Sequence, residues 1–301
     1  MPLNPMTASG TPRTALVTGG AGFVAGHLAR ELESAGCRVA LTDSAPAPNC
    51  RRVDLTDAAG VRALVAEVRP EAIVHLGAIS FVPDAARDPD LLERVNVGGT
   101  RNLLEAMLLA KLPRRAERRP AFLFVSTAQI ELRPLSPYAA SKLAAEKVVA
   151  EFGGKGIDAV VARPANHTGP GQSPRFVVPS FVRQALEIKA GVRPRFTVGN
   201  LDAVRDFTDV RDVARAYRLL LERGAAGATY GIGSRGRLAM RELLRKIAAL
   251  AGIPEDHEVD PALWRPADAS PETDAAAVRA LGWSPRLTLG ETLADMLTAG
   301  L

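Results

Sequence analysis

The first half of the chain alternates short β-branched apolar runs with longer segments of helical period, and this alternation limits the fold more than any other feature. Strands and helices in this order form βαβ units around a parallel sheet. The runs are continuously apolar, so helices are expected to cover both faces of the sheet. The sequence therefore predicts a doubly wound α/β fold. The expected strands are Thr14–Thr18, Arg38–Asp43, Ala72–Leu76, Ala121–Thr127 and Ile157–Arg163, and the expected helices are Gly22–Ala35, Asp57–Val68, Asp90–Leu112 and Tyr138–Phe152.

The regular alternation ends after Pro164, where a stretch rich in glycine and proline begins. Two further helices are expected at Phe176–Lys189 and Val210–Arg223, and prolines at 254, 261, 266, 271 and 285 divide the remainder into short elements. We therefore expect a second, smaller and irregular domain. The predicted division is a flexible tail over 1–12, a first domain over 13–170 plus roughly 205–235, and a second domain over 171–204 and 236–301.

Composition excludes several classes of protein. Of 301 residues, 47% are hydrophobic and 24% charged, which is ordinary for a globular chain and not for a disordered or fibrous one. No apolar run reaches the roughly 18 residues needed to cross a bilayer, and the first thirteen residues do not resemble a signal peptide. We therefore expect a cytoplasmic protein without a membrane partner.

Charge and cysteine content exclude further classes of partner and site. The net charge is +5, but only the stretch from Leu112 to Pro120 clusters arginines, and we interpret it as a solvated loop. No nucleic-acid partner is predicted. The two cysteines, Cys37 and Cys50, form no CxxC pair and have no neighbouring histidines, so neither a disulfide nor a metal site is predicted.

The first expected strand runs into GGAGFVAG and then into a helix. Gly19 and Gly22 allow the backbone to turn tightly and to approach a pyrophosphate, which then meets the free amides of the helix N-terminus. Ala25 takes the third position of the pattern, where the residue only mediates helix packing and a methyl group is tolerated. The turn therefore predicts a dinucleotide-binding (Rossmann) fold; the alternative is a plain strand-to-helix turn.

Two carboxylates follow this turn. Asp43 ends the second strand 21 residues after Gly22, where it can accept hydrogen bonds from the adenosine ribose and repel a 2′-phosphate. NAD(H) is therefore the expected cofactor, with NADP(H) as a second candidate. Asp54, in the VDLTD stretch, is expected to face the adenine edge.

One tyrosine and one lysine are spaced for proton transfer. The chain has three tyrosines and few lysines, and only Tyr138 is followed by a lysine, Lys142, four residues on. Ser136 and Pro137 read as the N-cap and first residue of a helix, which places both side chains on one face. A phenol titrates near pH ~10, and a nearby ammonium is expected to lower its pKa. Thr127, or Ser126 as the fallback, can hold a substrate carbonyl against the phenol.

The combined motifs resemble those of the extended short-chain dehydrogenase/reductase family of nucleotide-sugar enzymes. They are TGGAGFVAG, Asp43, VSTAQ, the Tyr138-Ala-Ala-Ser-Lys142 segment and RPANHTGPGQ, and the likeness extends over about 13–299. Within the family, NHTGPGQ, FVVPSF and VGNLDAVRDFTDVRDVARAY are most similar to reductases of GDP-4-keto-6-deoxy-mannose. The resemblance implies an NAD(P)-dependent oxidoreductase, with the first domain binding the dinucleotide and the second the nucleotide sugar.

The resemblance also implies roles for individual residues. The expected catalytic residues are Thr127, Tyr138 and Lys142. The expected cofactor-binding residues are Gly19, Gly22, Phe23, Val24, Asp43, Asp54, Leu55, Leu76, Gly77, Ala78, Tyr138 and Lys142. The expected substrate-binding residues are Ser126, Asn166, Val178, Arg205 and Arg265, of which Asn166 and the two arginines are expected to hold the diphosphate, consistent with bidentate guanidinium recognition.

Departures from the family pattern reduce the number of activities expected of this chain. Dehydratases carry acidic residues just after the catalytic threonine, whereas this chain has Ala128 and Gln129, so dehydration is not expected. Ala165 replaces the usual phenylalanine of RPFN, and Glu131-Leu132 replaces the usual Tyr-Gly, so the sugar pocket is expected to be reshaped. Two alternatives to a reductase remain, a nucleotide-sugar 4-epimerase and a non-catalytic NAD-binding module.

The helices over 90–112 and 138–152 are apolar beyond the needs of one sheet face, with Leu103, Leu104, Leu108 and Val148 as examples. In the family such helices pair between two subunits. We therefore expect a homodimer.

Overall fold

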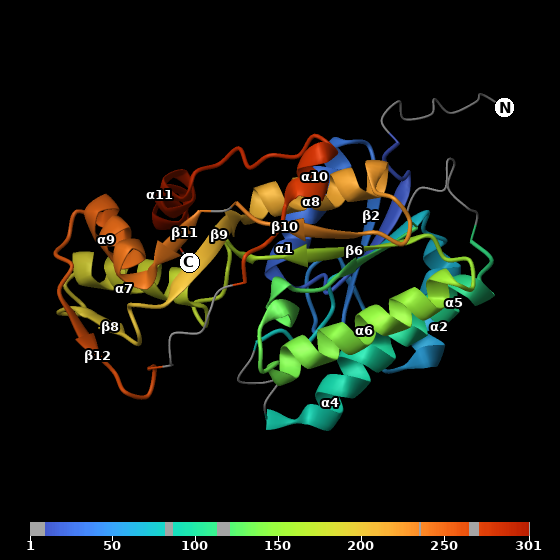
Figure 1. The fold of residues 1–301 in the computed structure, drawn as a ribbon, viewed down its shortest axis with the longest axis horizontal. Coiled ribbons are helices and arrows are strands. Elements are labelled where there is room, and N and C mark those ends of the chain that lie inside the picture. Colours follow the sequence, from blue (N-terminus) through green and yellow to red (C-terminus); the bar gives the residue numbers. More distant parts are fainter. Residues whose placement is uncertain (1–9, 82–86, 113–120, 235, 265–270, 301) are drawn as a thin grey trace. The chain divides into compact units, whose positions relative to one another are not determined.

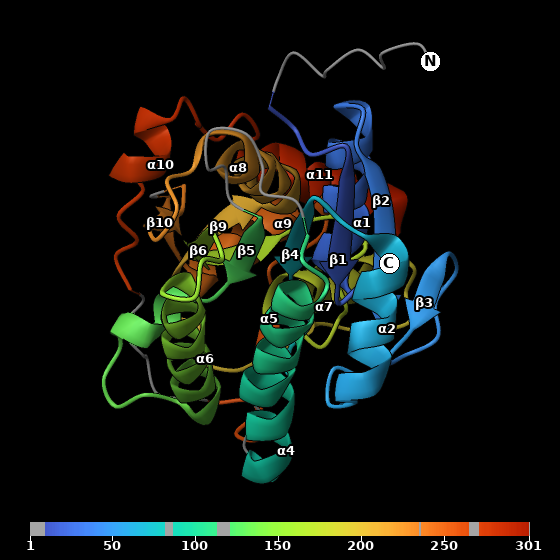
Figure 2. The same cartoon turned by 90° about the vertical axis from the view of Figure 1, so that its right-hand side faces the viewer.

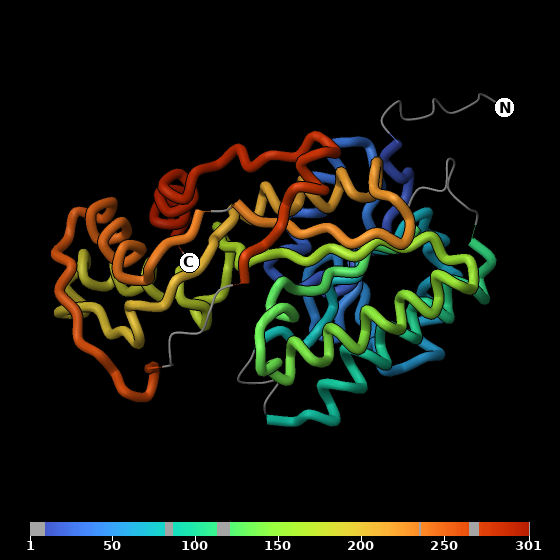
Figure 3. The backbone as a smooth tube through the Cα atoms, viewed as in Figure 1, coloured from blue at the N-terminus to red at the C-terminus, as the bar shows by residue number. Residues whose placement is uncertain are grey.

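A computed structural model describes residues 10–81, 87–112, 121–234, 236–264 and 271–300. The chain forms two compact units. Unit 1 comprises Met1–Pro164, Ala214–Ile232 and Asp274–Trp283, and unit 2 comprises Ala165–Val213, Gly233–Thr273 and Ser284–Leu301. The chain thus passes between the units several times (Figure 3). Compared with the boundaries expected from sequence, residues 165–170, 205–213 and 233–235 belong to unit 2 and residues 274–283 to unit 1.

Unit 1 is built on a seven-stranded sheet in the order β10-β6-β5-β4-β1-β2-β3. All its strand pairs are parallel. The strand order reverses between β1 and β4, which is the switch point where doubly wound sheets bind ligands. The strands are β1 (Thr14–Thr18), β2 (Arg38–Asp43), β3 (Cys50–Arg52), β4 (Ala72–His75), β5 (Phe122–Val125), β6 (Ala159–Pro164) and β10 (Thr229–Ile232).

Helices cover both faces of this sheet, so the predicted doubly wound α/β fold is confirmed. On one face lie α2 (Ala58–Val68), α5 (Gly99–Leu109) and α6 (Pro137–Gly153), and on the other lie α1 (Phe23–Ser34) and α8 (Val210–Arg223) (Figures 1 and 2). α10 (Ala276–Ala280) packs beside β10.

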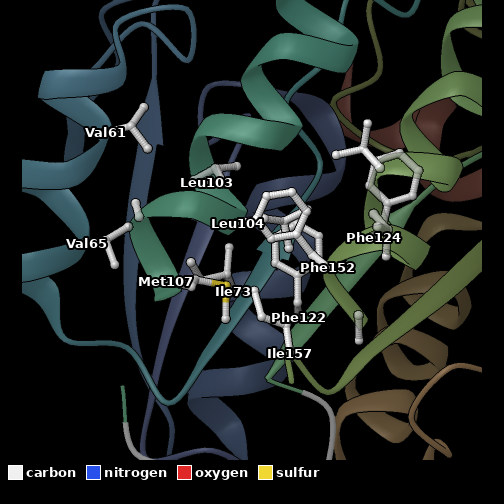
Figure 4. Packing of buried hydrophobic residues seen from close by; sticks show 14 of the residues in the cluster. Val61, Val65, Ile73, Leu103, Leu104, Met107, Phe122, Phe124, Phe152 and Ile157 are labelled. Atoms are coloured by element: carbon white, nitrogen blue, oxygen red, sulfur yellow. The ribbon is translucent and has the colours of Figure 1, made fainter. Parts of the chain in front are cut away.

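The core under α2, α5 and α6 consists of apolar side chains from these helices and from the central strands. Phe122, Phe124 and Phe152 are almost completely buried there, among aliphatic side chains such as Ile73 and Leu104 (Figure 4). Burying one phenylalanine side chain contributes about 2–3 kcal/mol. This packing holds β4 and β5 in place, and the segments that follow these two strands carry residues of the candidate active site.

Two elements of unit 1 differ from the sequence-based expectation. The single helix expected over Asp90–Leu112 is α4 (Pro89–Glu93), a π-helical turn η1 (Arg94–Gly98) and α5. A π-turn shifts the helical register and is frequent at functional sites, but a polar/apolar pattern does not reveal it. The short strand β3 was not predicted because only three residues pair with β2.

The apolar residues that suggested a dimer interface lie mostly inside the monomer. Leu103 and Leu104 are fully buried and Val148 is 6% exposed, because α5 and α6 pack against each other and against the sheet. Only Leu108, at 38% exposure, fits the original interpretation. The expectation was therefore wrong for three of the four residues.

The described residues of unit 2 form two small sheets and three helices around a core of their own. A three-stranded sheet has the order β11-β9-β7, and β8 pairs in parallel with β12. The strands are β7 (Asn166–Thr168), β8 (Phe196–Val198), β9 (Val204–Asp209), β11 (Arg237–Ala239) and β12 (His257–Val259), and the helices are α7 (Val177–Lys189), α9 (Met240–Ala251) and α11 (Leu289–Ala299). No helix in the described ranges is long and apolar enough to cross a membrane.

Candidate active site

The glycine turn between β1 and α1 has the geometry that a pyrophosphate requires. Gly19 has φ +71°, and a Cβ there would lie 2.9 Å from the backbone nitrogen of Gly77. A Cβ on Gly22 would lie 2.9 Å from the Gly19 carbonyl oxygen. Gly22 is the N-cap of α1 and offers no side-chain acceptor to the first-turn amides. The loops after β1 and β4 therefore leave a space that the side chain of any residue other than glycine would fill. Gly19 and Gly22 thus fit the close approach of a dinucleotide phosphate.

The carboxylate of Asp43 is fixed beside this turn. Its Oδ2 accepts a hydrogen bond from the Ala21 amide at 3.1 Å and its Oδ1 one from Ala45 at 3.0 Å. Asp43 ends β2, next to β1, where the ribose of a dinucleotide is expected. The exposed Asp54 instead accepts bonds from the amide and hydroxyl of Thr56, both at 2.8 Å, and so closes its own turn.

The other expected cofactor-binding residues lie around the same edge of the sheet. Phe23 and Val24 are half-buried in the first turn of α1. Leu76 and Ala78 are half-buried beside the buried Gly77, in the loop that follows β4. Leu55 is 9% exposed and packs against Gly77, since a Cβ on that glycine would lie 2.9 Å from its Cδ1.

Helix α6 begins where the sequence predicts. The Ser136 hydroxyl accepts a hydrogen bond from the Ala139 amide at 3.2 Å, and Pro137 occupies the first turn. Tyr138 and Lys142 lie one turn apart and are 9% and 3% exposed. The Thr127 hydroxyl lies close enough to the Tyr138 phenol to lower its pKa. The structure therefore brings Thr127 and Tyr138 together, from the end of β5 and the start of α6.

The phenol differs from expectation in its ionisation. Burial raises the pKa of Tyr138 to about 12, and the nearby Thr127 hydroxyl opposes this rise. Burial and Thr127 are the causes of this shift, so the expected lowering by Lys142 is absent; the Lys142 ammonium donates a hydrogen bond to the Val125 carbonyl at 2.7 Å. Tyr138 is therefore a neutral phenol at pH 7, which suits a proton donor.

Lys142 lies in an apolar environment. Its Nζ is 4.9 Å from the centre of the Phe124 ring. Burial lowers the pKa of Lys142 to about 7, and the carboxylate of Glu146 opposes that fall. The charge of this ammonium is therefore sensitive to its neighbours near neutral pH.

The sequence reasoning missed Asn96, which ties the catalytic helix to the loop after β4. Asn96 is 2% exposed and lies on the π-helical turn. Its Oδ1 accepts a bond from the Ile79 amide at 2.8 Å, and its Nδ2 donates to Ser141 Oγ at 2.9 Å. Ser141 in turn donates to the Tyr138 carbonyl at 2.8 Å. The signal in the sequence that could have revealed Asn96 is a polar residue among the apolar residues of one helix face.

His75 connects β1 to α5. Its Nδ1 lies 2.7 Å from Thr18 Oγ1, and its Nε2 lies 3.0 Å from Thr100 Oγ1. Burial, together with the charge of Lys142, lowers the pKa of His75 to about 3. The ring is therefore neutral, and it holds the strand that leads into the glycine turn.

The expected substrate-binding residues have different surroundings. Ser126, in unit 1, is 2% exposed and its hydroxyl has no hydrogen-bond partner among the described residues. In unit 2, Asn166 is half-buried on β7 and Arg205 half-buried on β9. Val178 is 1% exposed within the apolar cluster of unit 2, so its side chain packs in the core, contrary to expectation. Arg265 lies outside the described residues.

The sequence profile of the NAD dependent epimerase/dehydratase family matches residues 15–233, which contain the glycine turn, Thr127, Tyr138 and Lys142. The chain belongs to this family. The resemblance inferred from the motifs is thereby confirmed. As a member of this family, the chain is an NAD(P)-dependent enzyme that modifies nucleotide sugars.

Relatives of known activity or structure support this assignment. GDP-6-deoxy-D-mannose reductase of Pseudomonas aeruginosa is 36% identical over 301 residues, covering 94% of this chain and 95% of that protein. The structure of RMD from Pseudomonas aeruginosa complexed with NADPH is 34% identical with a TM-score of 0.82, covering 95% and 98% of the two chains. UDP-glucose 4-epimerase of Thermus thermophilus complexed with NAD is 31% identical, also with a TM-score of 0.82 and coverage of 95% and 98%.

Proposed function

We propose that this enzyme reduces the C4 ketone of a nucleotide-activated 4-keto-6-deoxy sugar, converting GDP-4-keto-6-deoxy-mannose to GDP-rhamnose. The observation that carries the proposal is the juxtaposition of the Thr127 hydroxyl with the buried, neutral phenol of Tyr138. The 36% identity to a GDP-6-deoxy-D-mannose reductase supports the choice of sugar and nucleotide.

The two hydroxyls have complementary tasks in such a reduction. When bound, a reduced nicotinamide supplies the hydride. Thr127 donates a hydrogen bond to the ketone oxygen, and Tyr138 transfers its proton to that oxygen as negative charge develops there. Because the pKa of Tyr138 is raised to about 12, the phenol still carries its proton throughout the neutral range. Lys142 is proposed to hold the nicotinamide ribose.

The residues after Thr127 favour reduction over dehydration. Removing water from a sugar requires an additional acid and base, and Ala128 and Gln129 offer neither. Ala128 is also buried, at 2% exposure.

The proposal is tested by following cofactor absorbance with purified enzyme and GDP-4-keto-6-deoxy-mannose. Loss of one NADH per product molecule, together with a product two mass units heavier, supports the reductase. Interconversion of the C4 epimers of a nucleotide sugar that bears a C4 hydroxyl, such as UDP-glucose, without net consumption of cofactor would instead identify the 4-epimerase. Calorimetric binding of NADH with no response to any nucleotide sugar would leave only a binding module.

In unit 2, Asn166 and Arg205 are proposed to bind the diphosphate, together with Arg265. A diphosphate carries about two negative charges and suits planar guanidinium groups. Ser126 is proposed to give its unpartnered hydroxyl to the sugar, because an unpaired buried hydroxyl costs about 1–3 kcal/mol unless a ligand satisfies it.

NADH is proposed as the preferred cofactor, with NADPH as the second. Replacing Asp43 by asparagine keeps the shape of the side chain and removes the charge that repels a 2′-phosphate. We expect the ratio of kcat/KM with NADPH to that with NADH to rise about tenfold. Steady-state kinetics with both cofactors measure this ratio for both proteins, and an unchanged ratio would show that Asp43 does not select the cofactor.

A homodimer remains a proposal based on the family resemblance. Leu109 on α5 is 66% exposed, and Leu108 beside it is 38% exposed. If a second copy covers this helix face, Leu109→Glu should convert the dimer to a monomer in sedimentation velocity experiments. Val192→Glu is the matched control, since Val192 is 77% exposed in unit 2. A wild-type monomer at micromolar concentration would contradict the proposal.

A further inference from the structure

An ion pair lies one helical turn beyond the candidate catalytic lysine. Glu146 follows Lys142 by four residues on α6, so the two side chains share one face of the helix. Arg163 on β6 donates two hydrogen bonds to Glu146, from Nε to Oε1 at 3.0 Å and from Nη2 to Oε2 at 2.6 Å. The Glu146 side chain is only 10% exposed. Its carboxylate is therefore fixed in place by a bidentate contact.

Lys142 has no ion-pair partner of its own in the described part of the chain. Its Nζ donates to the Val125 carbonyl and lies over the Phe124 ring, and neither group neutralises a charge. Burying an ammonium without a nearby carboxylate favours the neutral amine. The fixed carboxylate of Glu146 is the group that favours the charged form.

The other ionisable groups around Lys142 do not replace Glu146. His75, from β4, has a pKa lowered to about 3 and is neutral. Tyr138, one turn before on α6, has a pKa raised to about 12 and is also neutral. Arg163 on β6 is cationic, and its pKa is raised mainly by its hydrogen bonds to Glu146, with Glu131 from η3 (Ala128–Glu131) contributing.

We propose that Glu146, held by Arg163, is a positioning residue of the reduction that acts through Lys142 by keeping its ammonium charged near neutral pH. Glu146 and Lys142 share one face of α6, so the carboxylate can act on the ammonium directly, whereas the consequence for turnover rests on the proposed reductase function. The ion pair thus does more than fasten α6 to β6. It decides whether Lys142 can donate to a ribose hydroxyl as a cation.

The charge of Lys142 can be measured without any substrate. The chain contains six lysines, so a spectrum of protein labelled with ¹³C at lysine Cε is simple, and the signal lost in Lys142→Gln assigns the residue. In Glu146→Gln we expect the titration midpoint of Lys142 to fall by about one pH unit. If the reductase function also holds, raising the pH should abolish the activity of Glu146→Gln at a lower pH than that of the wild type, by the same shift as the Lys142 midpoint.

Two further variants separate this effect from a purely structural one. Glu151→Gln removes a carboxylate from the same helix, where Glu151 pairs with Arg101 at 3.0 Å and Lys155 at 2.7 Å, and it should leave the Lys142 midpoint unchanged. Arg163→Gln leaves the Glu146 carboxylate and removes the opposing positive charge, so the midpoint should stay or rise. A structural role predicts that Glu146→Gln and Arg163→Gln shift it in the same direction.

The proposal is overturned if the Lys142 midpoint in folded Glu146→Gln equals that of the wild type, or if Arg163→Gln lowers it as much as Glu146→Gln does. Should Glu146→Gln fail to fold, Arg163→Gln decides, because a lowered midpoint contradicts the proposal and an equal or raised one supports it. A shifted midpoint in an enzyme that reduces no sugar would refute the proposed function and leave the electrostatic role standing.

Discussion

Replacing Tyr138 by phenylalanine is expected to lower kcat by about 10²- to 10⁴-fold, because the ketone oxygen then receives no proton from the enzyme as the hydride arrives. The ring remains, and the substitution removes only the hydroxyl beside Thr127. NADH affinity should change little, and stability by about 1 kcal/mol. Rapid-mixing kinetics of NADH oxidation, with calorimetry of NADH binding, test both parts.

The chain offers a matched control for this substitution. Tyr217 on α8 is fully buried, and its hydroxyl has no hydrogen-bond partner among the described residues. Tyr217→Phe therefore removes a buried, unpaired polar group and should leave kcat within about threefold and stability equal or higher. Full activity of Tyr138→Phe would reject Tyr138 as the proton donor.

Much of unit 1 was predictable because its signals are local. The strand, the glycines and the helix N-terminus occur within one short segment, and Gly19 has the positive φ that the turn requires. The Ser136-Pro137 start of α6 is likewise encoded in adjacent residues. Local backbone requirements of this kind leave a residue pattern in the sequence.

Electrostatics and packing between distant elements were harder to predict. Burial raises the pKa of Tyr138 and Thr127 opposes the rise, and neither effect is visible in the spacing between Tyr138 and Lys142. Val178 was expected at the substrate, but it faces the core of its own unit. Asn96 was missed because its partners, Ile79 and Ser141, lie 17 and 45 residues away. These properties depend on the fold as a whole.

The largest effect on cofactor binding is expected from Gly19→Ala. The alanine would have to adopt φ +71°, and its Cβ would lie 2.9 Å from the backbone nitrogen of Gly77, which cannot move like a flexible side chain. We expect a loss of stability of about 2–3 kcal/mol and a Kd for NADH at least 100-fold higher. Urea denaturation measures the first, and calorimetry at a temperature where the variant is folded measures the second.

Gly26→Ala separates this backbone effect from the addition of a methyl group. Gly26 lies inside α1, where a Cβ would approach nothing closer than an Arg30 nitrogen at 3.9 Å. Alanine favours a helix interior over glycine by about 1 kcal/mol, so this variant should be as stable as the wild type or more stable and bind NADH normally. If Gly19→Ala binds NADH within threefold of the wild type, the close approach of the loops after β1 and β4 does not form the phosphate site. The cofactor would then have to bind elsewhere on the sheet edge, and the proposed role of Tyr138 beside the nicotinamide would no longer hold.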